Sequence, residues 1–154
     1  TKPNILLIPG ASFESKMYPA EKYAQLSKKI NANFIVLWGN PVERKIAQQI
    51  KILTPTVSLT SQLSIDNLKA LISVVDLVIG SDTGPVHMAW GLNKASITLF
   101  GSTPGYRNSF VTDINQIIES NSKVNPYKIN RNDFSIKDIR VNDVVKVANK
   151  LLIN

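Results

Sequence analysis

The sequence predicts an α/β fold with an open, doubly wound parallel sheet. Short apolar runs rich in β-branched residues alternate along the chain with longer segments of helical periodicity. This alternation is typical of βα units, whose parallel strands are covered by helices on both faces of the sheet. The chain has 154 residues, of which 44% are hydrophobic and 19% charged, a size and composition that suit one domain with its own core. We therefore expect one domain over residues 1–154.

The first half of the chain is expected to supply three strands and three helices. The strands are apolar runs at Asn4–Ile8, Asn33–Trp38 and Thr56–Leu59, and the helices follow them at Ala20–Ile30, Pro41–Leu53 and Ser64–Val74. Pro41 suits the first turn of a helix, where its missing N–H group is not needed. Ser64, followed by Asp66 and Asn67, is a helix-start signal. The apolar residues after it recur at helical spacing: Leu68, Leu71, Ile72 and Val75.

The second half continues the same pattern and ends in a helix. Its expected strands are Leu77–Gly80, Ser96–Phe100 and Gln116–Glu119, with a helix at Gly84–Leu92. The stretch Ser120–Asp138 is polar and lacks regular periodicity, so it is expected to be a loop. A final helix is expected at about Val141–Leu152, where the apolar residues are Val144, Val145, Val147, Ala148, Leu151 and Leu152.

The formal net charge of +7 favours an anionic partner: a nucleic acid, an anionic membrane surface or a phosphorylated small molecule. The basic residues are spread along the chain and are not interleaved with aromatic residues, so no nucleic-acid platform is expected. The chain has no cysteine and one histidine, which excludes thiolate and multi-histidine metal centres. No metal ligands are therefore expected, and a metal such as Mg²⁺ would have to bind through carboxylates or a bound phosphate.

No targeting or membrane-spanning segment is expected from this sequence. No charged leader or cleavage site precedes Asn4–Ile8, and no apolar run approaches the roughly 20 residues of a membrane span. We therefore expect a cytoplasmic protein, and the positive charge is compatible with a peripheral position at an anionic membrane surface.

In an open α/β sheet, ligands bind beyond the carboxyl ends of the strands, and three polar loops are expected there. The first follows Asn4–Ile8. In it Ser12 and Ser15 offer hydroxyls, Gly10 allows a close backbone approach, and Lys16 offers a point charge for a phosphate. The loop lacks the Gly-Lys-Ser/Thr of a Walker A sequence. An ordinary surface turn is the alternative interpretation.

The second loop follows Asn33–Trp38 and contains Glu43. A carboxylate at this place can accept hydrogen bonds from both hydroxyls of a ribose, as in dinucleotide-binding sites. Alternatively, Glu43 lies in the first turn of the next helix and interacts favourably with its dipole. The sequence leaves both interpretations open.

The third loop passes from Leu77–Gly80 through Ser81 directly into a helix. The free N–H groups and the dipole of a helix start form an anion site, and Gly84 leaves space for a phosphate against the backbone. Asp82 either caps this helix or binds sugar hydroxyls. His87, on the first turn, is expected to face the same ligand, although a lone helical histidine is commonly a surface or core residue.

These segments resemble a known family, the lipopolysaccharide heptosyltransferases, which use ADP-heptose and have the two-domain GT-B fold. Asp82-Thr83-Gly84-Pro85-Val86-His87-Met88-Ala89 is similar to the family's Asp-Ser/Thr-Gly-x-x-His-x-Ala signature, and Leu99-Phe100-Gly101-Ser102-Thr103 follows at the usual distance. Lys16-Met17-Tyr18-Pro19 with Tyr23 and Leu26 resembles its Lys-x-Trp-Pro-x-x-x-Trp/Tyr-x-x-Leu segment, and Gly39-Asn40-Pro41-Val42-Glu43 its Gly-x-x-x-Glu segment. Departures are Tyr18 for the commoner Trp, Ser102 for Pro, and Lys94-Ala95 for a basic-Pro pair.

The resemblance covers nearly the whole chain but only the family's carboxy-terminal half. It implies a Rossmann-like domain that binds the nucleotide-sugar donor, most simply ADP-heptose, for inverting transfer to the lipopolysaccharide inner core at the inner face of the inner membrane. The family's other half carries the acceptor site and the general base. No catalytic residue is therefore expected in this chain, and no metal or other cofactor is required, although Mg²⁺ could accompany the diphosphate.

The resemblance also implies a role for each candidate residue. Ser12 and Lys16 would hold the donor phosphates, and Glu43 would bind the ribose. Asp82 would bind the transferred sugar. The phosphate and sugar pocket would be completed by Thr83, Gly84 and His87.

Alternative functions are a related GT-B transferase or sugar epimerase that uses a UDP-sugar, a non-catalytic basic module that binds nucleic acid, and an adaptor at a membrane surface.

Overall fold

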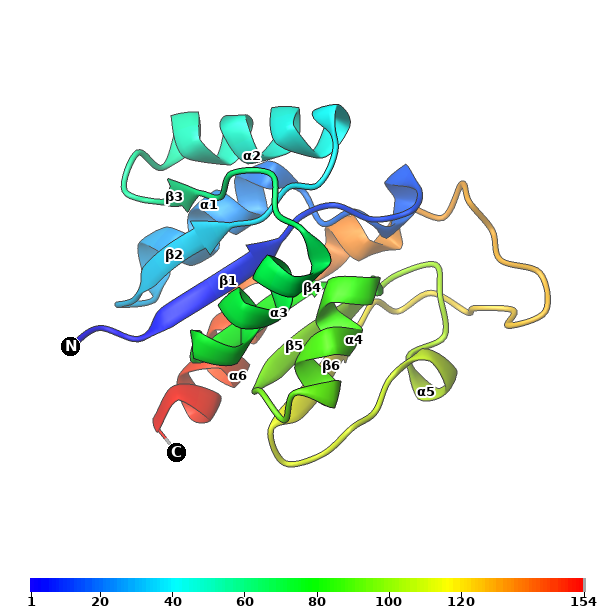
Figure 1. Cartoon of the computed structure of the whole chain (residues 1–154). Coiled ribbons are helices and arrows are strands. Elements are labelled where there is room, and N and C mark those ends of the chain that lie inside the picture. Colours follow the sequence, from blue (N-terminus) through cyan, green and yellow to red (C-terminus); the bar gives the residue numbers. More distant parts are fainter. Residues whose placement is uncertain (154) are drawn as a thin grey trace.

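The computed structural model describes residues 1–153 and shows a six-stranded sheet in which all strands are parallel. The strands are β1 (Asn4–Ile8), β2 (Asn33–Val36), β3 (Ser58–Leu59), β4 (Leu77–Ser81), β5 (Ser96–Phe100) and β6 (Asn115–Glu119). Their order across the sheet is β3-β2-β1-β4-β5-β6 (Figure 1). The direction of this order reverses between β1 and β4, so the predicted doubly wound, Rossmann-like sheet is confirmed.

Helices cover both faces of the sheet. They are α1 (Ala20–Lys29), α2 (Pro41–Leu53), α3 (Ile65–Val74), α4 (Gly84–Gly91), the short α5 (Gly105–Asn108) and α6 (Val141–Ile153). α1, α2 and α6 pack on one face, and α3 and α4 pack on the other, where they lie in front of the sheet in Figure 1. Among residues 1–153, none of the helices is both long and apolar enough to cross a membrane.

The two layers explain why the central strands are apolar throughout. Along β1, Ile5 and Leu7 belong to the core beneath α1, α2 and α6, whereas Leu6 and Ile8 belong to the core beneath α3 and α4. Every residue of β4 and β5 is buried. Burial on both faces requires a continuous apolar run in place of an alternating one, which is the pattern that predicted these strands.

Two strands are shorter than predicted. The run expected as Asn33–Trp38 forms a strand only to Val36, and the indole Nε1 of Trp38 donates to the Thr60 carbonyl at 2.7 Å. The run expected from Thr56 pairs only at Ser58–Leu59, because Val57 N donates to Thr54 O in the turn that follows α2. The predicted helix boundaries differ from the observed ones by one residue at most.

Short helical turns were missed where the sequence is polar. A 3₁₀ turn at Glu14–Lys16 lies in the first loop, and a second at Ser135–Asp138 interrupts the stretch that was predicted to be a loop throughout. Ile136 in this second turn is fully buried against Gly101, where an added Cβ would lie 2.6 Å from the Ile136 Cβ. A single buried residue leaves no periodicity in the sequence, which explains why the turn was not predicted.

Candidate functional site

A pocket of about 710 Å³ opens at the carboxyl ends of the central strands, where the strand order reverses between β1 and β4. This is the place at which an open α/β sheet binds its ligands, and the volume is in the usual range for a small-molecule site. All seven residues predicted for the site line this pocket: Ser12, Lys16, Glu43, Asp82, Thr83, Gly84 and His87. Three loops that are far apart in the sequence thus meet at one site.

The first loop directs Lys16 into the pocket. The 3₁₀ turn at Glu14–Lys16 turns the chain back, so that Lys16 Nζ lies 3.4 Å from Ser12 Oγ and 3.4 Å from Asp82 Oδ2. The side chain of Lys16 is 11% exposed. Ser15, which was also expected to offer a hydroxyl to a ligand, is buried and does not line the pocket, so that expectation was wrong.

The second loop supplies Glu43 from the first turn of α2. The side chain of Asn40 caps this helix by accepting hydrogen bonds from the N–H groups of Val42 and Glu43. In return, Glu43 Oε2 accepts a 2.7 Å hydrogen bond from Gly39 N, an arrangement close to a capping box. Glu43 therefore takes part in the helix start, as one interpretation held, and its carboxylate also faces the pocket.

Gly10 allows Glu43 to approach the first loop closely. A Cβ at Gly10 would lie 2.4 Å from the Glu43 carboxyl carbon, so a side chain at this position would displace the Glu43 carboxylate. Because Gly10 has no side chain, the backbone of the first loop can lie against the Glu43 carboxylate of the second loop.

The third loop places Asp82 at the centre of a polar cluster. Asp82 is 6% exposed. Its Oδ1 lies 3.1 Å from His87 Nε2, and its Oδ2 accepts a 3.0 Å hydrogen bond from Asn108 Nδ2 in addition to the Lys16 contact. Burial alone would raise the pKa of Asp82, but the hydrogen bond from Asn108 and the charge of Lys16 hold that pKa below its ordinary value.

Asp82 does not cap α4, so the capping interpretation was wrong. The N-cap residue is Thr83, whose side chain makes no capping hydrogen bond. The N–H groups of the first turn are therefore without a side-chain partner, and a Cβ at Gly84 would meet no atom within 4 Å. The Thr83 hydroxyl is buried without a hydrogen-bond partner in the protein. Together with Lys16, this helix start is suited to an anion.

Part of the pocket lining is apolar. It is formed by residues from the end of β2, from the segment before α3 and from α3 itself: Leu37, Trp38, Leu63, Ile65 and Leu68. An apolar slot next to an anion site can accept a flat ring that is joined to a phosphate chain. Sequence reasoning missed this slot, because it assigned the apolar residues of α3 to the core alone.

Sequence reasoning also missed Asn108, whose Nδ2 donates a hydrogen bond to Asp82. Asn108 is the last residue of α5, a four-residue helix that was not predicted. The only available signal for Asn108 was a polar residue beyond the carboxyl end of a predicted strand.

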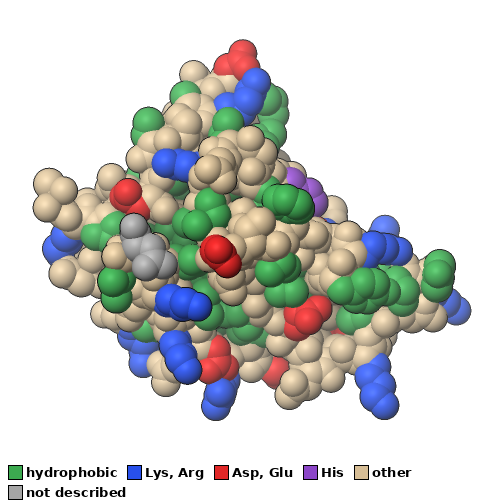
Figure 2. Space-filling model, turned by 90° about the horizontal axis from the view of Figure 1, so that it is seen from below, with side chains coloured by type: hydrophobic (Ala, Val, Ile, Leu, Met, Phe, Trp, Pro, Cys, Tyr) green, Lys and Arg blue, Asp and Glu red, His purple; other side chains and the backbone are tan. Residues whose placement is uncertain are grey.

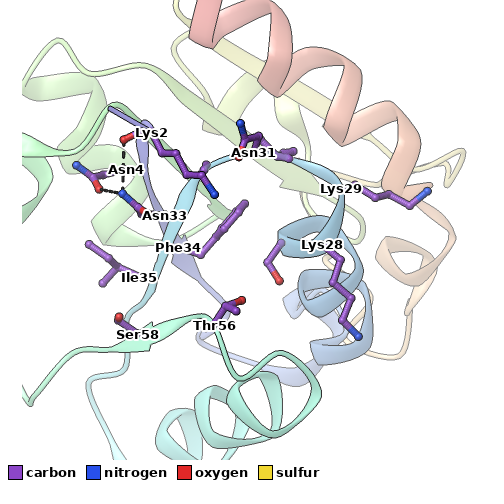
Figure 3. A pocket seen from close by; sticks show the side chains of 13 residues that line it. Lys2, Asn4, Lys28, Lys29, Asn31, Asn33, Phe34, Ile35, Thr56 and Ser58 are labelled. Atoms are coloured by element: carbon purple, nitrogen blue, oxygen red, sulfur yellow. Dashed lines mark hydrogen bonds between the residues drawn. The ribbon is translucent and has the colours of Figure 1, made fainter.

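A second hollow, of about 800 Å³, lies at the opposite, amino ends of β1 and β2 (Figure 3). It is lined by Lys2, Lys28 and Lys29, but the side chains of Lys28 and Lys29 point away from one another. Lys29 Nζ donates to Asn142 Oδ1 of α6 at 2.9 Å. This hollow is larger than the first pocket, but it lies away from the strands' carboxyl ends, and Asn33 Nδ2 within it already donates to Asn4 Oδ1 at 3.1 Å. Within residues 1–153 no group of three or more acidic or histidine side chains could hold a metal.

Comparisons with known proteins agree with the motifs. Residues 1–134 match glycosyltransferase family 9 (heptosyltransferase). Lipopolysaccharide heptosyltransferase 1 of Campylobacter coli is 38% identical over 160 residues, which cover 97% of this chain and 47% of that protein. Lipopolysaccharide heptosyltransferase 2 of Escherichia coli (strain K12) is 27% identical over 115 residues, which cover 68% of this chain and 33% of that protein. The chain thus spans about half the length of the first of these relatives.

Solved structures share the fold. A glycosyl transferase family 9 protein from Veillonella parvula DSM 2008 superposes with a TM-score of 0.85 at 18% identity, over 99% of this chain and 46% of that one. E. coli heptosyltransferase WaaC with ADP gives a TM-score of 0.82 at 16% identity, over 97% of this chain and 44% of that one. The predicted fold class, one half of a GT-B glycosyltransferase, is confirmed.

Proposed function

The chain belongs to glycosyltransferase family 9, the heptosyltransferases, and we propose on that basis that its pocket binds the nucleotide-sugar donor ADP-heptose. The observation that carries the proposal is the convergence of the seven motif residues in one pocket at the reversal point of the sheet. The residues 1–154 then form the donor-binding domain of an enzyme that transfers heptose, with inversion, to the lipopolysaccharide inner core.

The polar end of the pocket suits the diphosphate. Lys16 and Ser12 face the start of α4, whose first-turn N–H groups have no side-chain partner. Donors held in this arrangement would stabilise the negative charge that develops on the departing diphosphate. Because these groups already supply positive potential, the transfer does not require a metal, and Mg²⁺ would enter only with the diphosphate. Thr83, Gly84 and His87 border the same space.

The rest of the pocket suits the nucleoside and the sugar. The slot lined by Leu37 and Leu68 would receive the adenine ring, and Glu43, next to this slot, would accept the ribose hydroxyls. Asp82 lies beside Lys16 and His87, at the phosphate end. A sugar attached to the second phosphate would meet this cluster.

The acceptor site and the general base of the transfer would lie outside this chain. The relatives named above are described as lipopolysaccharide heptosyltransferases, and this chain covers 47% of the Campylobacter coli protein. We assign the acceptor site and the general base to a second half of the same size. The acceptor, a lipopolysaccharide core, would be met at the cytoplasmic face of the inner membrane, where the positive charge of the chain favours a peripheral position.

The distribution of charge weighs against a nucleic-acid partner. On the face shown in Figure 2, lysine and arginine side chains lie at several places, both within the face and at its edges, and acidic side chains lie among them. A nucleic-acid platform instead presents a basic stripe with aromatic residues on which bases stack.

Calorimetric titration of the chain with ADP, UDP, GDP and a short oligonucleotide tests the proposal. We expect ADP to bind at one site and more tightly than UDP or GDP, and the oligonucleotide to bind weakly or not at all. Preference for UDP would replace ADP-heptose with a UDP-sugar. Tight binding of the oligonucleotide without binding of any nucleotide would overturn the proposal.

A further inference from the structure

Three side chains from distant parts of the chain contact the carboxylate of Asp82: one comes from the first loop, one from α4 and one from α5. His87 lies against Oδ1, while Asn108 Nδ2 and Lys16 Nζ both approach Oδ2, at 3.0 Å and 3.4 Å respectively. The carboxylate is buried, so water cannot replace a missing partner easily. The geometry of each of these side chains therefore depends on the other two.

The amide of Asn108 is held in one orientation. Its Oδ1 accepts a 3.2 Å hydrogen bond from Arg107 Nε, and Arg107 Nη1 donates at 2.7 Å to the carbonyl of Pro126. A flipped amide would set its oxygen against the Asp82 carboxylate and its nitrogen against the Arg107 guanidinium. The arrangement thus requires an asparagine, which offers a donor to Asp82 and an acceptor to Arg107.

Asn108 and Lys16 compete for the same oxygen of Asp82. A charge-assisted bond from an ammonium group to a carboxylate is typically about 2.7–2.9 Å long. The 3.4 Å contact of Lys16 is longer than that, whereas the neutral amide of Asn108 is at normal hydrogen-bond distance. Lys16 is therefore directed by Asp82 without being fully paired with it, and its ammonium group keeps donors for a ligand in the pocket.

We propose that Asn108 is a positioning residue of the donor site, which acts through Asp82 to keep Lys16 available to the donor diphosphate. This inference rests on the proposed function, since it assumes that the pocket binds a nucleoside diphosphate. Without the amide, the ammonium group of Lys16 moves onto Asp82 Oδ2 and forms a full ion pair. The diphosphate must then break that pair in order to bind.

Titration with ADP of the wild type, Asn108→Ala, Lys16→Ala and the double variant tests the inference. We expect Asn108→Ala to weaken ADP binding about tenfold, the scale of one hydrogen bond to a charged group. We expect no further loss from Asn108→Ala once Lys16 is already alanine. The matched control is Tyr106→Ala on the same short helix, because Tyr106 is 74% exposed and makes no hydrogen bond to Asp82; it should bind ADP like the wild type.

Asn108→Asp gives a second readout that a purely structural role would not change. The new carboxylate would face Asp82, and the other groups around it are Lys16, His87, the Thr103 hydroxyl and Arg107. Two facing carboxylates share a proton as the pH falls. The ratio of the ADP dissociation constants of Asn108→Asp and the wild type should therefore be largest near pH 8 and should decrease toward pH 5.

The outcomes separate this inference from the function on which it rests. Failure of the wild type to bind ADP would overturn the proposed function. If the wild type binds ADP and Asn108→Ala binds it equally tightly, the role of Asn108 alone is overturned. The same follows if Asn108→Ala lowers the ADP affinity equally in the wild type and in Lys16→Ala. A pH-independent ratio for Asn108→Asp would also contradict it. Thermal melting of each variant establishes that the protein compared is folded.

Discussion

Lys16 is the side chain on which the phosphate assignment depends most directly. It lines the same pocket as the start of α4, and its ammonium group lies 3.4 Å from both Ser12 Oγ and Asp82 Oδ2. We expect Lys16→Ala to weaken the binding of ADP and of ADP-heptose alike, by about 1.5–3 kcal/mol, because the lost contact is to the phosphates that both ligands share. Lys28→Ala, at the opposite end of the sheet, is the control and should leave both affinities unchanged. Calorimetry measures the affinities for ADP and ADP-heptose. Unchanged affinities in Lys16→Ala would contradict the assignment of Lys16 to the donor phosphates.

Asp82 should make folding stability depend on pH. Its pKa in the folded protein is held below the ordinary value of 3.8, against the effect of burial, by Asn108 and Lys16. Because the pKa of Asp82 is lower in the folded state than in the unfolded state, the ionised carboxylate stabilises the protein fully at any pH above the unfolded-state pKa. This stabilisation is lost as the pH falls through the folded-state pKa. We expect the difference in unfolding free energy between the wild type and Asp82→Asn to be largest above about pH 5 and to shrink toward pH 2. A difference that stays constant with pH would show that the charge of Asp82 is not stabilising.

Residue types and spacing identified seven residues that line the pocket, but neither its apolar lining nor the contacts among the seven. Ser15 and Lys16 are adjacent in a polar loop, yet one is buried away from the pocket and the other lines it. The sequence left Asp82 as either a cap or a ligand-binding group, and the structure shows a buried carboxylate shared by three side chains. Asn108 lies 26 positions from Asp82, so no local pattern could have indicated their contact.

Among the structural elements, β4 and α4 each contain a glycine, and the space around the two glycines differs. A Cβ at Gly80 would lie 2.9 Å from Ile8 Cβ and from Val86 Cγ2, whereas a Cβ at Gly84 would meet nothing within 4 Å. We expect Gly80→Ala to lower the unfolding free energy by about 1–3 kcal/mol through overpacking. Gly84→Ala should leave stability nearly unchanged but weaken ADP binding, because the methyl group occupies space beside the free N–H groups of the helix. Thermal melts with and without ADP separate the two effects, and equal losses of stability in both variants would refute the distinction.

Elements that are long or buried on both faces were predicted closely, whereas β3 was predicted two residues too long and α5 was not predicted. β4 and β5 are buried throughout and have continuous apolar runs. β3 has two residues and α5 four, lengths over which neither periodicity nor composition is informative. α5 carries Asn108, so the unpredicted part of the fold includes a residue of the candidate site.

At the scale of the whole molecule, the sheet reversal between β1 and β4 brings the three predicted loops to one edge. Neither carboxylate predicted for this pocket is free to act as a general base: Glu43 accepts from Gly39 N, and Asp82 is shared by three side chains. We therefore expect residues 1–154 alone to bind donor without transferring heptose to a lipopolysaccharide core acceptor. Product analysis after incubation with ADP-heptose and acceptor checks this expectation. Robust transfer by the isolated chain would show that a base within it had been overlooked.

A structure of the chain with ADP bound would show which pocket holds the nucleotide. We expect the diphosphate between Lys16 and the first turn of α4, with the adenine ring against Leu37 and Leu68. ADP seated instead in the hollow at the amino ends of β1 and β2, beside Lys2 and Lys28, would contradict this expectation.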